Sequence, residues 1–114
     1  MRDDTERLRD ILEAIQRVQK YAARGRSDFE RDELLQTWVV HHVQIIGEAS
    51  RKLSDGFKQR YSHLPWRQII AMRNILVHDY FSVDRDEVWA AVEHDLPELK
   101  RKIEAILKEI DEQV

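Results

Sequence analysis

Apolar residues recur at steps of three and four along most of this chain, which is the spacing of a helix with one buried face. Over residues 3–23 they form a single stripe between charged residues, and the pattern predicts a first helix that Gly25 ends. The stripe consists of Leu8, Ile11, Leu12, Ile15, Val18 and Ala22. Ser27-Asp28-Phe29-Glu30 then has the form of a capping box, which indicates that another helix begins there.

The second predicted helix covers residues 28–54 and carries a wide apolar face, so we expect it to be the central helix. Gly47 interrupts it at a cost of up to about 1 kcal/mol relative to Ala, which indicates that another element packs closely against its backbone. The residues expected on the buried face are Phe29, Leu34, Leu35, Trp38, Val39, His42, Ile45, Ile46, Ala49 and Leu53.

Two further helical regions follow. Pro65 suits the first turn of a helix that continues through Trp66 to Ile75. The last region starts near Asp84, and Pro97 should bend or divide it. No stretch shows the alternation of a strand. We therefore predict an all-α fold class, a compact bundle of four to five helices in a single domain over residues 1–114.

Composition agrees with a soluble helical protein, because 36% of residues are charged and there are three Gly and two Pro. A chain of 114 residues buries only about two thirds of its unfolded surface, so we expect a partner to contribute to stability. The absence of cysteine excludes disulfides, thiolate catalysis and cysteine zinc sites. We expect a cytoplasmic protein with no signal peptide, membrane helix or membrane partner.

The net charge of −3 counts against RNA as a partner, because nucleic-acid affinity depends on neutralising phosphates. The charge is unevenly distributed, however. Residues 51–73 contain six basic residues and one acid, whereas residues 84–114 contain ten acids and five bases. Phe57, Tyr61 and Trp66 lie among the basic residues, where they either stack on unpaired bases or belong to the core. For Trp66 we favour the core.

Arg73 to Tyr80 is the segment in which reactive side chains gather. The Arg73 guanidinium presents a planar set of donors that suits a phosphate, and His78 gains or loses its proton near neutral pH. Two residues that lie five positions apart on a continuous helix point in directions roughly 140° apart. The helix must therefore end or bend near Val77 if Arg73 and His78 are to serve one site. His78 is then expected at a helix C-terminus, where the dipole favours its protonated form.

Arg73, His78 and Tyr80, with Asn74 directly after the arginine, resemble the signature of HEPN-domain ribonucleases. The variant is that of the HepT-like toxins of MNT/HEPN toxin–antitoxin pairs, in which MNT is a minimal nucleotidyltransferase. Similarity extends to Ile46-Gly47-Glu48-Ala49, Leu64-Pro65-Trp66 and residues 83–89, and so covers most of the chain. The resemblance implies a HEPN-like bundle that forms a symmetric homodimer with a composite site.

The resemblance further implies a type VII-like toxin whose substrate is RNA and whose catalytic residues are Arg73 and His78. A metal-free ribonuclease uses the substrate's 2′-hydroxyl as nucleophile and needs a base, an acid and positive charge. Two chains would bring two Arg73 and His78 sets into one cleft. In the family, the tyrosine at the position of Tyr80 receives AMP from the antitoxin nucleotidyltransferase. ATP is used by that partner, and this chain is expected to bind no cofactor.

Asn74, Asp79 and Glu48 are predicted to support the site. Asn74 and Asp79 add hydrogen-bonding groups within the motif. Glu48 follows Gly47, and its carboxylate either reaches Arg73 or His78 or faces solvent; the sequence leaves both open.

Other classes of function remain as alternatives. HEPN-like domains also act as non-catalytic, nucleotide-binding or adaptor subunits of a nucleotidyltransferase, but the intact Arg73, His78 and Tyr80 favour an enzyme. A metal-dependent nuclease is disfavoured because the carboxylates near the motif show no paired spacing. His41 and His42 point about 100° apart on a helix without a neighbouring metal-binding motif, so we predict packed or capping roles for them.

Overall fold

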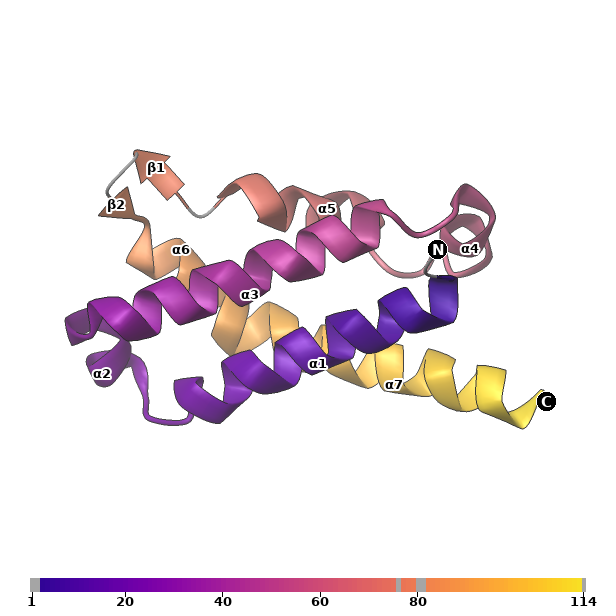
Figure 1. Cartoon of the computed structure of the whole chain (residues 1–114), viewed down its shortest axis with the longest axis horizontal. Helices are drawn as coiled ribbons and strands as arrows, with labels where there is room; N and C mark the ends of the chain where they lie inside the picture. The colour runs from indigo at the N-terminus through magenta and orange to yellow at the C-terminus, as the bar shows by residue number, and fades with distance from the viewer. Residues whose placement is uncertain (1–2, 76, 80–81, 114) are drawn as a thin grey trace.

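The computed structural model describes residues 3–75, 77–79 and 82–113, and it shows an elongated helical bundle measuring 46 × 25 × 25 Å. Helices α1 (Asp4–Ala22) and α3 (Glu33–Arg51) run side by side along the long axis (Figure 1). Helix α5 (Trp66–Ile75) packs on α3, and α7 (Leu96–Glu112) packs on α1. The predicted all-α bundle and the central position of α3 are confirmed.

Short elements connect the long helices. These are α2 (Arg26–Arg31), α4 (Asp55–Arg60), α6 (Arg85–Ala90) and the π-helical turn η1 (Ala91–Asp95) that joins α6 to α7. Strands β1 (Val77–Asp79) and β2 (Ser82–Val83) pair antiparallel directly after α5, with Val77 opposite Val83 and Asp79 opposite Ser82. The sequence did not predict this pair, because two and three residues are too few to display an alternating pattern.

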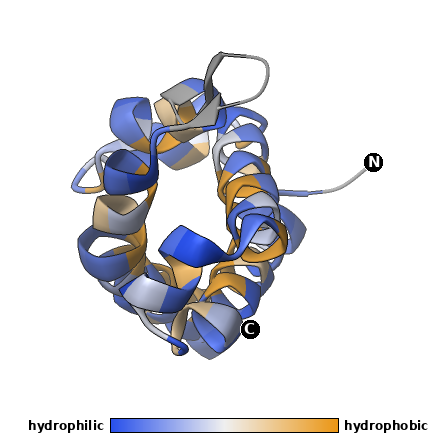
Figure 2. Ribbon diagram, turned by 90° about the vertical axis from the view of Figure 1, so that its left-hand side faces the viewer, coloured by the Kyte–Doolittle hydropathy of each residue, from blue (hydrophilic) through white to orange (hydrophobic). Residues whose placement is uncertain are grey.

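The core lies between the inward faces of the long helices, where apolar residues colour the ribbon orange in Figure 2. From α1 it takes the predicted stripe, with Leu8, Ile11, Ile15 and Val18 fully buried. The largest fully buried side chains contributed by other elements are Phe29, Val39, Val43, Ile46, Val88, Leu96 and Ile103. Predicted burial fails for Leu34, which lies in the first turn of α3 and is 82% exposed.

Asp32 divides the predicted second helix, so the expected single element over 28–54 is wrong. Its backbone is extended (φ −113°, ψ 103°), and its carboxylate accepts hydrogen bonds from the N–H groups of Leu34 and Leu35 at 3.0 and 3.2 Å. Aspartate is a preferred N-cap, and here it caps α3 itself. The predicted capping box at Ser27 is not used, because α2 begins after Gly25 at φ +97°.

Pro97 has the predicted effect on the last helical region. It lies in the first turn of α7. Because the N–H groups of a first turn have no acceptor within the helix, proline costs no internal hydrogen bond there. The preceding turn widens to accommodate it, and the N–H of Leu96 donates to the carbonyl of Ala91, five residues back. This turn is η1, and single π-turns of this kind occur inside otherwise α-helical segments.

The aromatic residues of the basic segment belong to the core. Tyr61 is 5% and Trp66 8% exposed, and the Trp66 indole N–H donates to the carbonyl of Tyr61 at 3.0 Å. The prediction for Trp66 is therefore confirmed, and neither ring is available to stack on bases. Part of the positive charge is also neutralised, because Lys58 pairs with Asp55 and Arg60 with Glu109, both at 3.8 Å.

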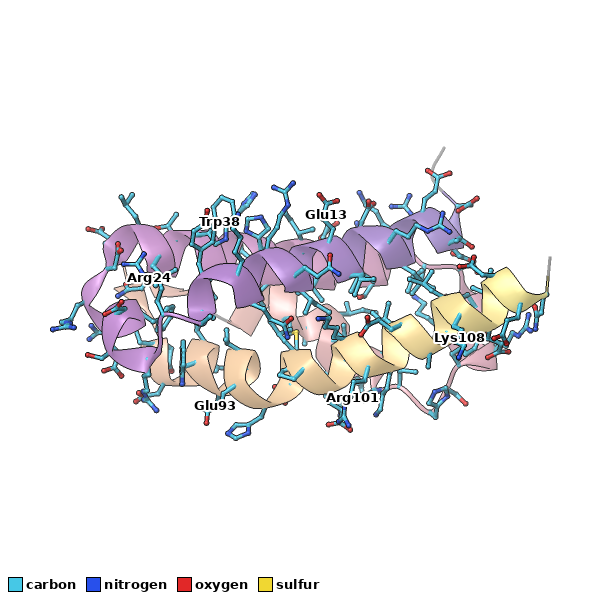
Figure 3. All side chains as sticks on the ribbon, turned by 90° about the horizontal axis from the view of Figure 1, so that it is seen from below. Glu13, Arg24, Trp38, Glu93, Arg101 and Lys108 are labelled. Atoms are coloured by element: carbon cyan, nitrogen blue, oxygen red, sulfur yellow. The ribbon has the colours of Figure 1, made fainter. Side chains whose placement is uncertain are left out.

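Charged side chains cover the outward faces of the bundle, as the labelled Glu13, Arg24, Arg101 and Lys108 illustrate (Figure 3). Several pair along one helix, for example Arg17 with Glu13 at 2.8 Å. Such exposed pairs contribute about 0.3–0.5 kcal/mol each, so packing of the core dominates stability. Within the described ranges, no helix has the length and apolar character needed to cross a membrane.

Helix α5 is attached to the bundle mainly through α3, and the closest contact is at Gly47. A Cβ atom at Gly47 would lie 2.6 Å from the backbone nitrogen of Arg73 and 3.0 Å from the carbonyl oxygen of Ile70. The predicted close approach is thus confirmed, and the approaching element is α5, the helix that carries Arg73 and Asn74. On its other side, a cleft of about 490 Å³ separates α5 from η1 and α7.

Substituting Gly47→Ala should destabilise the protein by about 1–3 kcal/mol, the usual range for overpacking, because the clashing atoms belong to the backbone of α5 and the helix must move. Chemical denaturation with circular dichroism measures the change. Gly56→Ala is the matched control, because a Cβ there meets nothing within 4 Å and α4 gains helix propensity. Equal stability of the two variants would show that α5 does not depend on this contact.

Candidate active site

The end of α5 presents the first half of the motif. Arg73 and Asn74 lie in its last turn, and the helix ends at Ile75, so the predicted end of the helix near Val77 is confirmed. His78 belongs to β1 by its backbone, which corrects its expected place at a helix C-terminus. The side chains of His78 and Asp79, and Tyr80 as a whole, lie outside the described residues.

Glu48 faces Arg73 across the contact between α3 and α5. A guanidinium nitrogen of Arg73 lies 3.3 Å from one carboxylate oxygen of Glu48, and Arg51 donates to the other oxygen at 2.7 Å. The hydrogen bond from Arg51 is the main cause that lowers the pKa of Glu48, with a smaller contribution from Arg73. Of the two readings of Glu48, the structure shows the one in which its carboxylate reaches Arg73.

Arg73 is held but not enclosed, because its side chain is 36% exposed and, among the described residues, it pairs with Glu48 through one guanidinium nitrogen. It also lines an open cleft of about 450 Å³, which we call the Arg73 cleft. Its lining residues are His41, Gln44, Ile45, Glu48, Arg73 and Asn74. A partly exposed guanidinium that one carboxylate holds in place is suited to binding a phosphate in this cleft.

Three residues of this site were not predicted from the sequence. His41 and Gln44 line the Arg73 cleft, and Arg51 holds the far oxygen of Glu48. A signal was present in the sequence, because residues 41, 44, 45 and 48 are spaced three and four apart and therefore share one face of α3. Starting from Glu48, this spacing would have pointed to His41 and Gln44 as its neighbours on the cleft wall.

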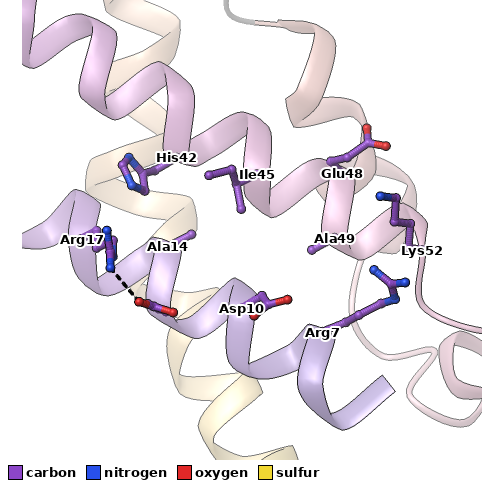
Figure 4. A pocket seen from close by; sticks show the side chains of 10 residues that line it. Arg7, Asp10, Ala14, Arg17, His42, Ile45, Glu48, Ala49 and Lys52 are labelled. Carbon is purple, nitrogen blue, oxygen red and sulfur yellow. Dashed lines mark hydrogen bonds and ion pairs between the residues drawn. The ribbon is translucent and has the colours of Figure 1, made fainter. Parts of the chain in front are cut away.

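A second groove of about 460 Å³ lies between α1 and α3 and meets the Arg73 cleft at Ile45 and Glu48 (Figure 4). Ala14 and Ala49 leave room between the two helices. Its basic and acidic lining residues are equal in number: Arg7, Arg17 and Lys52 against Asp10, Glu13 and Glu48. This balance gives the groove no preference for an anion, in contrast to the exposed guanidinium of Arg73.

His42 has the packed role that was predicted for it. It is 5% exposed, and its Nδ1 lies 2.8 Å from the carbonyl oxygen of Trp38. His41, by contrast, is exposed at the cleft. In the part of the chain that the structure describes, no three His, Cys, Asp or Glu side chains gather as metal ligands would.

Comparison with known proteins identifies relatives over nearly the whole chain. The family model described as "Ribonuclease HepT-like" matches residues 11–106. A Thermococcus cleftensis protein named "Probable ribonuclease HepT" is 38% identical over 102 residues, which cover 89% of this chain and 93% of that protein. A Methanocaldococcus jannaschii protein named "Gamma-glutamylcyclotransferase and putative RNase" is 38% identical over 105 residues, and the match spans 91% of this chain but 47% of that longer protein.

A solved structure shares the fold. It is described as "Crystal structure of the toxin-antitoxin with AMP-PNP", and it matches with a TM-score of 0.70 and 22% sequence identity. The match covers 93% of this chain and 98% of that one. The helical bundle, the family model and the relative matched along almost its full length agree with one another. The chain therefore belongs to the HepT-like ribonuclease family.

Proposed function

We propose that this chain is the toxin of a type VII-like toxin–antitoxin system and acts as a metal-independent endoribonuclease. The observation that carries the proposal is the Arg73 cleft. There a partly exposed guanidinium is held by Glu48, lines the cleft, and lies at the end of the helix that leads into the strand of His78. Membership of a ribonuclease family supports the same activity.

In the proposed reaction, the 2′-hydroxyl of the RNA loses its proton to a base and its oxygen attacks the adjacent phosphorus. The bond from phosphorus to the 5′-oxygen breaks, and that oxygen takes a proton from an acid. The products are a 2′,3′-cyclic phosphate and a 5′-hydroxyl. Arg73 stabilises the charge that develops on the phosphorane, and His78 transfers protons. Glu48 fixes Arg73, while Asn74 and Asp79 supply further hydrogen bonds.

One histidine does not readily serve as both base and acid in a single turnover, so we propose a symmetric homodimer that joins two motifs in one composite cleft. A dimer would also gather the two exposed guanidinium groups of Arg73 around one RNA backbone, which offsets the net charge of −3.

Control by a partner forms part of the proposal. A cognate minimal nucleotidyltransferase would bind ATP, and the phenolic oxygen of Tyr80 would attack its α-phosphate, releasing pyrophosphate and losing a proton. The resulting Tyr80–AMP adds negative charge and bulk two residues from His78. The toxin–antitoxin description of the structure with the same fold supports an antitoxin partner.

Arg73→Ala and His78→Ala should each lower RNA cleavage by at least about 100-fold and remove growth inhibition, because each deletes a group that acts in the transition state. Cleavage is measured with labelled RNA, and circular dichroism checks the fold. Arg67→Ala, an exposed arginine on the same helix, and His63→Ala are matched controls that should retain activity. A wild-type protein that cuts no RNA yet binds the nucleotidyltransferase would favour the non-catalytic adaptor.

The cleavage reaction should persist in EDTA and leave 2′,3′-cyclic phosphate ends, because the substrate hydroxyl replaces a metal-bound water as nucleophile. Mass spectrometry of the product termini and assays with and without chelator measure this. Loss of activity in EDTA with recovery in magnesium would contradict the metal-free mechanism.

Sedimentation at micromolar concentration should report about twice the chain mass of 13.7 kDa, as expected for a homodimer with a composite site. Mixing an Arg73→Ala chain with a His78→Ala chain should restore part of the activity if each chain contributes residues to a shared cleft. A monomer that cleaves RNA would rule out the composite site.

Co-expression with the cognate nucleotidyltransferase should add AMP to Tyr80 and weaken RNA binding, because the added phosphate carries negative charge into the proposed path of the substrate. Intact-mass analysis detects the adduct. Tyr80→Phe should still cleave RNA and escape silencing if the hydroxyl serves only for modification. An adduct that persists on Tyr80→Phe would remove this role from Tyr80.

A further inference from the structure

On α3, the wall of the Arg73 cleft carries two side chains, His41 and Gln44, that have no role in the proposed reaction. His41, Gln44 and Glu48 follow one another at helical spacing, opposite Arg73 and Asn74 on α5. Glu48 is occupied by its two arginines. His41 is exposed, and its imidazole makes no hydrogen bond or ion pair with any described residue, so the ring is accessible to a ligand in the cleft.

Packing behind His41 restricts its position. Its ring meets the ring of His42 edge to face at 90°, with 5.1 Å between centroids. His42 is itself buried against Trp38, whose ring centroid lies 4.3 Å away and whose carbonyl bonds to Nδ1. Trp38 in turn donates from its indole N–H to the carbonyl of Arg17 on α1 at 3.2 Å. The exposed ring of His41 thus packs against side chains that are themselves held in place. This restraint lowers the conformational entropy that His41 loses when a ligand packs on it.

The chemistry of the cleft matches a nucleotide better than an isolated anion. Arg73 is opposed by Glu48 in the lining, and with Arg51 the group keeps only one net positive charge, so attraction for a phosphate accounts for just part of the cleft's chemistry. The cleft adds an aromatic ring from His41 and side-chain amides from Gln44 and Asn74. Proteins recognise unpaired RNA with these kinds of side chain. Aromatic rings stack on the bases, and amides form hydrogen bonds with base edges or ribose.

We propose that His41 is a substrate-contacting residue: a nucleotide of single-stranded RNA lies against its imidazole ring, next to the phosphate held by Arg73. The inference rests on the proposed ribonuclease function and names where the substrate lies in that site.

The test measures binding without cleavage. The probe is a mixed-sequence single-stranded RNA in which every 2′-hydroxyl is methylated, so that the nucleophile is blocked, and fluorescence anisotropy reports its affinity for the full chain. His41→Ala should weaken binding by about 5-fold or more, the lower end of the loss of one stacked base. His41→Phe should restore most of it. His94→Ala is the matched control, an exposed histidine on η1 that should bind as wild type.

Cleavage of unmodified RNA gives a second readout: His41→Ala should raise KM and leave kcat within about 3-fold. Wild-type affinity in His41→Ala, with loss of affinity in Arg73→Ala, overturns the inference and leaves the proposed function standing. A loss confined to kcat, or a change of oligomeric state in His41→Ala, also overturns it, since His41 would then transfer protons or contact a second copy. Absence of both binding and cleavage in the wild type removes the proposed function together with the inference.

Discussion

The contact between Gly47 and the backbone of Arg73 is the constraint on which the candidate site depends. Only hydrogen at this position allows α5 to approach α3 so closely, because a Cβ would lie 2.6 Å from the Arg73 nitrogen. The close approach brings the Arg73 side chain within 3.3 Å of the next residue on α3, Glu48. One small residue therefore determines both the packing of the motif helix and the ion pair that orients its guanidinium.

The ion pair has an electrostatic consequence of its own. Glu48 serves two arginines, so the three side chains together leave one net positive charge at the edge of the cleft. A carboxylate that is shared in this way stays ionised to lower pH than an ordinary glutamate, which its lowered pKa reflects. Arg51 makes the shorter hydrogen bond to Glu48 and so balances much of the charge of this carboxylate. Glu48 therefore fixes Arg73 without cancelling the attraction of Arg73 for phosphate.

Much of the fold was predictable from periodicity, because long helices with one buried face leave a strong pattern in the sequence. Helix α1 and the effect of Pro97 followed from it directly. The break at Asp32 was missed because an acidic residue between two helical turns reads equally well as a solvent-facing position. Gly47 and Glu48 were found from the sequence, and periodicity placed His42 on the buried face, but His41 was given a packed or capping role. The cleft that His41 lines exists only where α3 and α5 pack together, and the sequence pattern of α3 by itself does not contain that information.

The attachment of α5 has a further implication for how the protein moves. This helix has only 10 residues, packs mainly on α3, and borders a cleft of about 490 Å³ on the side of η1 and α7. Local opening free energies follow the number of buried contacts, so the stability of the segment that carries Arg73 depends on the contact between α3 and α5. A ligand that bridges α3 and α5 across the Arg73 cleft would add contacts between the two helices, so that binding of the ligand and attachment of α5 are thermodynamically linked.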